Sequence, residues 1–363
     1  MSPAFSIYLD LLRLAAALLV FAHHAAYPRY HGSWLQGLAG FGHEAVVVFF
    51  VLSGYVIAHT REHKDHDWRH YVVQRLSRLW SVLLPAIALT LLLDACGRPL
   101  LPSLYEPLHG GWVRALASLF FVNEFWIQGF ALGSNIPLWS LSYEAGYYLL
   151  FGVLSFASPR WRWPLAMLVG LLVGPRILLL LPAWYLGVWI QRSAWLRERS
   201  ARQGAALAAA GLLWALVWSL GKLGNQFITW RLMALLPPSL AQQLGASEAF
   251  VSDNLIALGV AAHVAGMSAW LLGRAGWTAL GFWVPLLSRA TFPIYLFHYP
   301  LLQFFAALTA VWPSLAYGGV TVLALLVSVG LTEPCERLRH ALRSLLRRVL
   351  LTPSSLGARG QAL

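Results

Sequence analysis

Charged residues are scarce in this chain. Only 11% of its 363 residues are Asp, Glu, Lys or Arg, whereas a soluble domain carries about 25%. Hydrophobic residues make up 59%, and apolar runs of about 20 residues, the length that spans a bilayer, recur along the chain. These runs are continuous and do not alternate as the strands of an outer-membrane barrel do. The composition therefore predicts an all-α protein, a polytopic bundle of membrane helices.

Cysteine is rare, and the common cofactor-binding motifs are missing. The two cysteines, Cys96 and Cys335, fall on opposite sides of the membrane in the topology given below, so we expect no disulfide and no metal cluster. The sequence contains no P-loop, no Gly-rich dinucleotide loop and no GxSxG motif. A phosphorylated donor would therefore have to be held by arginines.

About ten segments are predicted to span the membrane. No Lys or Arg precedes the first apolar run and no small-residue cleavage site follows it, so we predict a retained span and not a signal peptide. The fifth and sixth spans are short and separated at Gly174–Pro175, which favours broken or tilted helices. The apolar stretches 113–133 and 277–287 are expected to be interfacial or re-entrant. The predicted spans lie near residues 7–27, 41–60, 79–96, 138–157, 164–175, 177–191, 204–221, 253–273, 292–311 and 315–332.

The net charge of +12 comes from basic residues that lie mostly between these spans. Ten spans place both termini on one side of the membrane, and 19 of the 26 Lys and Arg residues fall on that side, against five on the other. Cytoplasmic loops are enriched in Lys and Arg. We therefore expect cytoplasmic termini, a multi-pass protein in the lipid bilayer of the inner membrane, and no nucleic-acid partner.

Two regions are expected along the chain. Residues 1–340 are predicted to form one membrane domain, and residues 341–363 a basic cytoplasmic tail. The segment "ERLRHALRSLLRRVL" predicts a basic amphipathic helix on the inner leaflet. An ordinary solvated tail is the alternative interpretation.

The first predicted span carries four ionisable residues, which are Asp10, Arg13, His23 and His24. A charge at the centre of a bilayer costs roughly 2.5–3.5 kcal/mol, so such residues usually face a polar interior. At about 100° per residue, Arg13 and His24 lie within roughly 20° of each other on a helix and about 16 Å apart, whereas His23 points about 80° away. Asp10 is one turn from Arg13 and in position to pair with it. The alternative is a structural ion pair with an interfacial histidine.

The segment "RHYVVQRLSRLWSVLLP" places Arg75 and Arg78 one turn apart at the cytoplasmic start of the third span. Two guanidinium groups on one face can hold a phosphate through bidentate hydrogen bonds. Anchoring by the positive-inside rule is an equally good explanation of the pair, and it needs no ligand.

Three further polar positions lie in predicted spans. Ser53–Gly54 in "FFVLSGYVI" permits a close helix approach or a local kink. Glu144 lies in the aromatic segment "IPLWSLSYEAGYYLLF", and a buried carboxylate of this kind needs a polar cavity or a partner. His298 lies in the ninth span, where a lone histidine is more often a satisfied core residue than a functional one. We expect Ser53 and His298 to contribute to substrate binding.

These segments, in this order, resemble the acyltransferase 3 family of membrane acyltransferases over about residues 7–340. Arg13 and His24 match the arginine, ten residues, histidine pattern of the family, and "RLSRLWSVLLP" matches its paired-arginine segment. The other similar segments are "GHEAVVVFFVLSGYVI", "LWSLSYEAGYYL", "FPIYLFHYPLL" and "TEPCERLRHAL". Each segment is a weak signal alone, but together and in order they are specific.

The resemblance implies transfer of an acyl group, often acetyl, from cytoplasmic acyl-CoA to a hydroxyl of a carbohydrate, a glycoside or another small acceptor. It marks five residues as matches to functional positions of the family: Arg13, His24, Arg75, Arg78 and Glu144. No metal is implied. The acceptor itself is left open by the resemblance.

A mechanism follows from these residue types as a hypothesis. His24 would act as the general base that takes the proton of the acceptor hydroxyl, and Arg75 and Arg78 would hold CoA phosphates. Arg13 would stabilise the oxyanion or line the pantetheine path, and Glu144 would orient His24 or the acceptor. Because no Ser or Cys resembles an activated nucleophile, direct transfer is favoured over an acyl-enzyme.

A proton-coupled transporter or flippase of a sugar-containing substrate is the main alternative. Intramembrane ionisable residues would suit such a carrier as well. The chain shows no inverted repeat, which argues against it. A membrane glycosyltransferase is a third possibility, although no acidic metal-binding cluster is evident.

Overall fold

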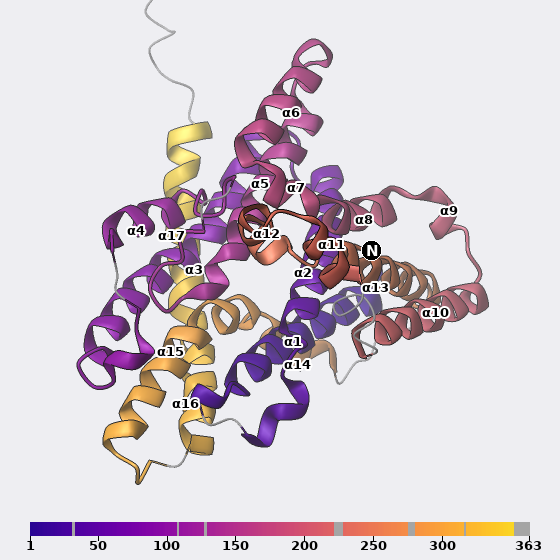
Figure 1. Cartoon of the computed structure of the whole chain (residues 1–363). Coiled ribbons are helices and arrows are strands. Elements are labelled where there is room, and N and C mark those ends of the chain that lie inside the picture. Colours follow the sequence, from indigo (N-terminus) through magenta and orange to yellow (C-terminus); the bar gives the residue numbers. More distant parts are fainter. Residues whose placement is uncertain are drawn as a thin grey trace, which may run out of the picture.

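A computed structural model describes residues 1–30, 33–106, 109–126, 129–220, 228–274, 280–315 and 317–351. These residues form helices and contain no strand, so the predicted all-α fold is confirmed (Figure 1). The helices are α1 (Pro3–Ala25), α2 (Gly42–His63), α3 (Trp68–Gly97), α4 (Gly111–Leu119), α5 (Trp139–Phe156), α6 (Pro159–Val173), α7 (Pro175–Leu179), α8 (Leu181–Arg192), α9 (Ala194–Arg197), α10 (Ala201–Leu220), α11 (Trp230–Leu235), α12 (Pro238–Leu244), α13 (Phe250–Trp270), α14 (Leu280–Ser288), α15 (Thr291–Val311), α16 (Tyr317–Gly330) and α17 (Thr332–Leu351).

Seven helical segments of the described residues are long and apolar enough to cross a membrane. They are α1, α2, α3, α10, α12 with α13, α15, and α16 with α17. The three other predicted spans correspond to shorter helices, which are α5, α6 and the pair α7 and α8. The bundle therefore combines long apolar helices with short ones.

The break predicted at Gly174–Pro175 is confirmed, because α6 ends at Val173 and α7 begins at Pro175. Gly174 has a φ of +83°, which glycine adopts without strain. A Cβ at this position would lie 2.7 Å from the Cα of Trp126. The helix therefore breaks where another segment of the chain passes against it.

The close helix approach predicted at Ser53–Gly54 is also confirmed. α2 packs against α8, and a Cβ on Gly54 would lie 2.0 Å from the carbonyl oxygen of Trp184. The contact is reciprocal, since a Cβ on Gly187 would lie 1.9 Å from the carbonyl oxygen of Val51. Small residues let helix backbones touch in this way.

The core is built around α1, which packs against α2, α14 and α15, while α3 packs against α15 and α17. α10 and α13 form a separate pair beside them (Figure 1). The predicted tail helix exists as α17, and it lies along α3. Its position on the inner leaflet stays a prediction. Residues 352–363 of the tail, Lys222 and residues 277–279 lie outside the described residues.

We expect Gly54→Val to destabilise the protein, because the new side chain would have to displace the backbone of α8. Overpacking of this kind costs about 1–3 kcal/mol. The melting temperature in detergent should therefore fall clearly below that of the wild type. Gly319→Ala is the control, since a Cβ at Gly319 meets nothing within 4 Å. Equal melting temperatures of the two variants would contradict the close α2–α8 contact.

Candidate active site

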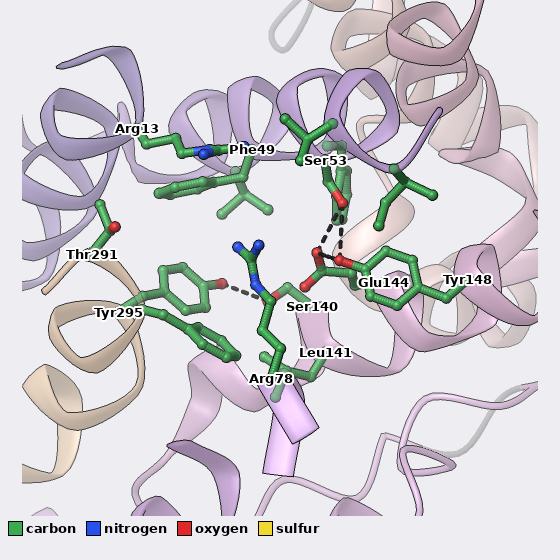
Figure 2. A pocket seen from close by; sticks show the side chains of 15 residues that line it. Arg13, Phe49, Ser53, Arg78, Ser140, Leu141, Glu144, Tyr148, Thr291 and Tyr295 are labelled. Carbon is green, nitrogen blue, oxygen red and sulfur yellow. Dashed lines mark hydrogen bonds between the residues drawn. The ribbon is translucent and has the colours of Figure 1, made fainter. Parts of the chain in front are cut away.

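Three cavities follow α1 from its N-terminal half to its C-terminal end. The entrance cavity is lined by Asp10, Arg13, Arg78, Arg289, Glu336 and Arg339, among others. The central cavity is lined by Arg13, Ser53, Arg78, Ser140, Glu144, Tyr148, Thr291 and Tyr295, among others (Figure 2). The histidine cavity, with a volume of about 560 Å³, is lined by His23, His24, His43, Glu124, Trp139 and Arg176, among others.

The cavities adjoin one another. The entrance and central cavities share Arg13 and Arg78, and the central and histidine cavities share Val46 and Tyr295. The central cavity is the smallest of the three, with a volume of about 80 Å³. The arginine-rich entrance is at the end that the charge distribution assigns to the cytoplasm, and His24 is at the other end.

The central cavity gathers four of the polar residues singled out in the sequence, which are Arg13, Ser53, Arg78 and Glu144. Figure 2 shows the guanidinium group of Arg78 extending into the cavity, with no hydrogen bond to the residues drawn. Ser53 Oγ donates to Glu144 Oε1 at 2.8 Å, and the Tyr148 hydroxyl donates to the same carboxylate. Ser53 also accepts from Trp184 Nε1 at 3.2 Å. Ser53 and Glu144 are thus held by protein groups on one wall.

Arg13 lies where the entrance and central cavities meet. Its predicted pairing with Asp10 is confirmed, with Arg13 Nη1 donating to Asp10 Oδ1 at 3.4 Å. Arg13 and His24 line different cavities, in agreement with their separation of about 16 Å along the helix. A group that reacts beside His24 is therefore remote from Arg13.

His24 is hydrogen-bonded to His298 of α15, with 2.8 Å between His24 Nδ1 and His298 Nε2. His298 Nδ1 lies 2.9 Å from the carbonyl oxygen of Ile294 and must donate to it, because a carbonyl only accepts. In neutral His298, Nε2 is then the acceptor, so His24 donates from Nδ1. This assignment leaves Nε2 of His24 with a free lone pair.

This geometry bears on two sequence expectations, those for His298 and Glu144. His298 is fully buried and both of its ring nitrogens are hydrogen-bonded within the protein, and its contribution to substrate binding stays a prediction. Glu144 contacts Ser53 and Tyr148 in the central cavity, so the residue that orients His24 is His298. Sequence spacing could not reveal the pair, because its members are 274 residues apart.

The structure does not bring Arg75 and Arg78 to one cavity. Arg75 Nη2 pairs with the buried Asp65 at 3.1 Å, and Arg75 lines an apolar cavity between α3 and α5. Arg78 lines the entrance and central cavities instead. This arrangement does not favour a single phosphate held between Arg75 and Arg78.

Two charged pairs of the histidine cavity escaped the sequence analysis. Arg176 Nη1 donates to Glu124 Oε2 at 2.6 Å, and both side chains are buried. His43 Nε2 lies 2.9 Å from Asp253 Oδ2. Each pair joins segments distant in the chain. The Gly174–Pro175 break was the available signal for Arg176, because it turns the chain directly before that residue.

The described residues hold no group of three or more His, Cys, Asp or Glu side chains arranged for a metal ion. The titratable groups of the three cavities are instead paired or form hydrogen bonds with other residues, or are arginines at the entrance. The entrance cavity gathers four arginines, and the histidine cavity is lined by His24, whose Nε2 keeps a free lone pair.

Comparison with known proteins identifies the domain. The family model described as "Acyltransferase domain" matches residues 6–333. Acyltransferase MdmB from Streptomyces mycarofaciens is 35% identical over 153 residues, 39% of this chain and 36% of the relative. Two further relatives are peptidoglycan O-acetyltransferase OatA from Listeria monocytogenes (26% identical over 180 residues) and putative peptidoglycan O-acetyltransferase YrhL from Bacillus subtilis (30% over 179). These matches cover 46% of this chain and 26% and 24% of the relatives, and no solved structure matches the chain.

The hydrogen bonds of His24 predict its tautomer. In protein labelled with nitrogen-15 histidine, we expect His24 Nδ1 to show the shift of a protonated nitrogen and Nε2 that of an unprotonated one at neutral pH. Because the chain has 12 histidines, a His24→Gln spectrum assigns the signals. A proton on Nε2 of His24 would contradict the bond to His298.

Proposed function

Because this chain belongs to the acyltransferase 3 family, whose domain covers residues 6–333, we propose the following reaction. The protein transfers an acyl group, with acetyl as the expected group, from cytoplasmic acyl-CoA to a hydroxyl of a carbohydrate or glycoside. His24 is the general base. The matched relatives are longer proteins than the matched stretch, so their acceptors are a guide to this chain and not an assignment.

The observation that carries the proposal is the hydrogen bond from His24 Nδ1 to His298 Nε2. It leaves the lone pair of His24 Nε2 available, which is the state that a general base requires. A neighbouring acceptor that fixes the tautomer of a basic histidine is a recurring device in acyl transfer. His23 is a poorer base, because its ring is bonded to the Gly40 N–H at 2.8 Å and to the Tyr27 hydroxyl at 2.9 Å.

The donor would enter at the arginine-rich entrance cavity. CoA carries phosphates, and guanidinium groups bind phosphates in bidentate geometry. Four arginines from different segments of the chain line this cavity, which are Arg13, Arg78, Arg289 and Arg339. We assign the phosphates to this group. Arg75 is not assigned to the phosphates, because its guanidinium group is already paired with Asp65.

The pantetheine arm would pass through the central cavity. It is a narrow chain with amide and hydroxyl groups, and the cavity wall offers polar partners at Ser53, Glu144 and Ser140. Arg13 belongs to this path. The thioester would then lie in the histidine cavity beside His24.

The acceptor would reach the histidine cavity from the end opposite the entrance. One of the matched relatives is named a peptidoglycan O-acetyltransferase and another a putative one, which supports a carbohydrate acceptor. Direct transfer from CoA to this hydroxyl fits the cavity series, since donor and acceptor would meet at His24.

We expect His24→Ala to abolish acceptor-dependent acyl transfer and to leave CoA binding intact. Loss of a general base lowers the rate by about 10²–10⁴-fold. The assay follows label from tritiated acetyl-CoA and release of free CoA, in nanodiscs, across a set of sugar acceptors. If the wild type neither binds CoA nor turns over with any acceptor, the donor assignment is wrong. Acceptor transport without CoA would then favour a carrier.

Arg78→Gln and Arg289→Gln should each raise the KM for acetyl-CoA. A charge-assisted hydrogen bond is worth about 1.5–3 kcal/mol, which corresponds to roughly 10- to 100-fold. Arg98→Gln is the control, because Arg98 lines none of the three cavities. An unchanged KM in both cavity variants would exclude the entrance cavity as the phosphate site.

A further inference from the structure

The histidine cavity is lined by an arginine, Arg176, as well as by His24. Arg176 is the second residue of α7, directly after the break at Gly174–Pro175, and it lines the same cavity as His24. Arg176 is buried, with 4% of the residue exposed. The inference below rests on the proposed acyl transfer and adds a residue to it.

The guanidinium group is fixed from two sides. Nε and Nη2 donate to the carbonyl oxygen of Gln243, at 2.8 and 2.6 Å, and Nη1 donates to Glu124 Oε2 at 2.6 Å. An arginine has five N–H donors. Three of them are used by these bonds, so one N–H on Nη1 and one on Nη2 are left over.

Two glycines pack against the guanidinium group. A Cβ on Gly129 would lie 3.5 Å from Arg176 Nη1, and a Cβ on Gly245 would lie 3.1 Å from Nη2. Both glycines line the histidine cavity with Arg176. The glycines therefore bring backbone, and no side chain of their own, against the two nitrogens that retain an N–H.

The segment that presents Glu124 is held in an unusual conformation. Phe121 and Trp126, on either side of Glu124, have φ values of +60° and +57°, which side chains other than glycine rarely adopt. The Trp126 N–H donates to the Val173 carbonyl oxygen, next to Gly174. Strained backbone persists where surrounding contacts over-determine it, and it concentrates at functional sites. Here it sets the carboxylate that positions Arg176.

We propose that Arg176 is the catalytic residue that stabilises the oxyanion of acyl transfer. The acceptor oxygen forms a bond to the thioester carbon, and its proton passes to His24 Nε2. The π electron pair moves onto the carbonyl oxygen, which accepts the two remaining N–H groups of Arg176. When the carbonyl re-forms, the C–S bond breaks, and the CoA sulfur leaves with the proton from His24.

This assignment replaces Arg13 in that role. Arg13 is about three helical turns, or roughly 16 Å, from His24, whereas Arg176 shares a cavity with the base. Donors fixed before the reaction stabilise developing charge without reorganisation. Glu124 is a positioning residue, because it holds Arg176 and balances its charge when no oxyanion is present.

The test is Arg176→Gln with tritiated acetyl-CoA and the acceptor that the wild type uses. Removal of one oxyanion donor lowers kcat by about 10²–10³-fold, while the KM for acetyl-CoA should stay within about threefold. Free guanidinium at millimolar concentration should restore part of kcat. Arg98→Gln should keep wild-type kcat.

Arg176→Lys provides a second variant if Arg176→Gln does not fold. The ammonium group keeps the charge and a bond to Glu124, but not the planar fork. We expect an unchanged melting temperature and a kcat at least about tenfold lower.

Wild-type kcat in either folded variant would overturn the assignment. A loss of kcat that is accompanied by a lower melting temperature and is not restored by guanidinium would also overturn it. That result would mean that Arg176 and Glu124 form a structural ion pair. A wild type without CoA-dependent turnover is a different result, because it rejects the proposed function itself.

Discussion

The hydrogen bond between His24 and His298 is the interaction on which the site depends. It joins α1 to α15 in the interior of the bundle and fixes the proton of His24 on Nδ1, because His298 itself donates to Ile294. Nε2 is thereby left unprotonated on a ring that lines the last of the three cavities along α1. In the proposed reaction, the entrance arginines and the polar wall of the central cavity position the donor so that its acyl group reaches this nitrogen.

Buried charges in this molecule follow one rule, which is that a charge held away from water needs a partner. Arg75 is paired with Asp65, and Arg176 with Glu124. Arg78 points into the central cavity without a bond to the residues around it (Figure 2). The difference separates arginines that the fold satisfies from one that a ligand would satisfy. Arg176 is partly satisfied by the fold, since its protein partners accept three of its five N–H groups.

The sequence predicts the helical membrane fold well, because long apolar runs permit few other structures. The break at Gly174–Pro175 and the close contact at Gly54 were predictable from residue type alone. The partners of His24 and Arg176 were not, because they depend on contacts 274 and 52 residues away. Spacing placed Arg75 beside Arg78, but tertiary structure gave Arg75 its own carboxylate. Local patterns thus identify polar positions, and packing decides their roles.

The central claim is that one donor molecule extends from the entrance cavity to His24. A cryo-electron microscopy structure with a non-reactive acetyl-CoA analogue tests it most directly. The account predicts phosphate density between Arg78, Arg289 and Arg339, and the acyl carbonyl next to His24 Nε2 and Arg176. Density for the analogue in the apolar cavity at Arg75, or with its acyl end away from His24, would contradict it.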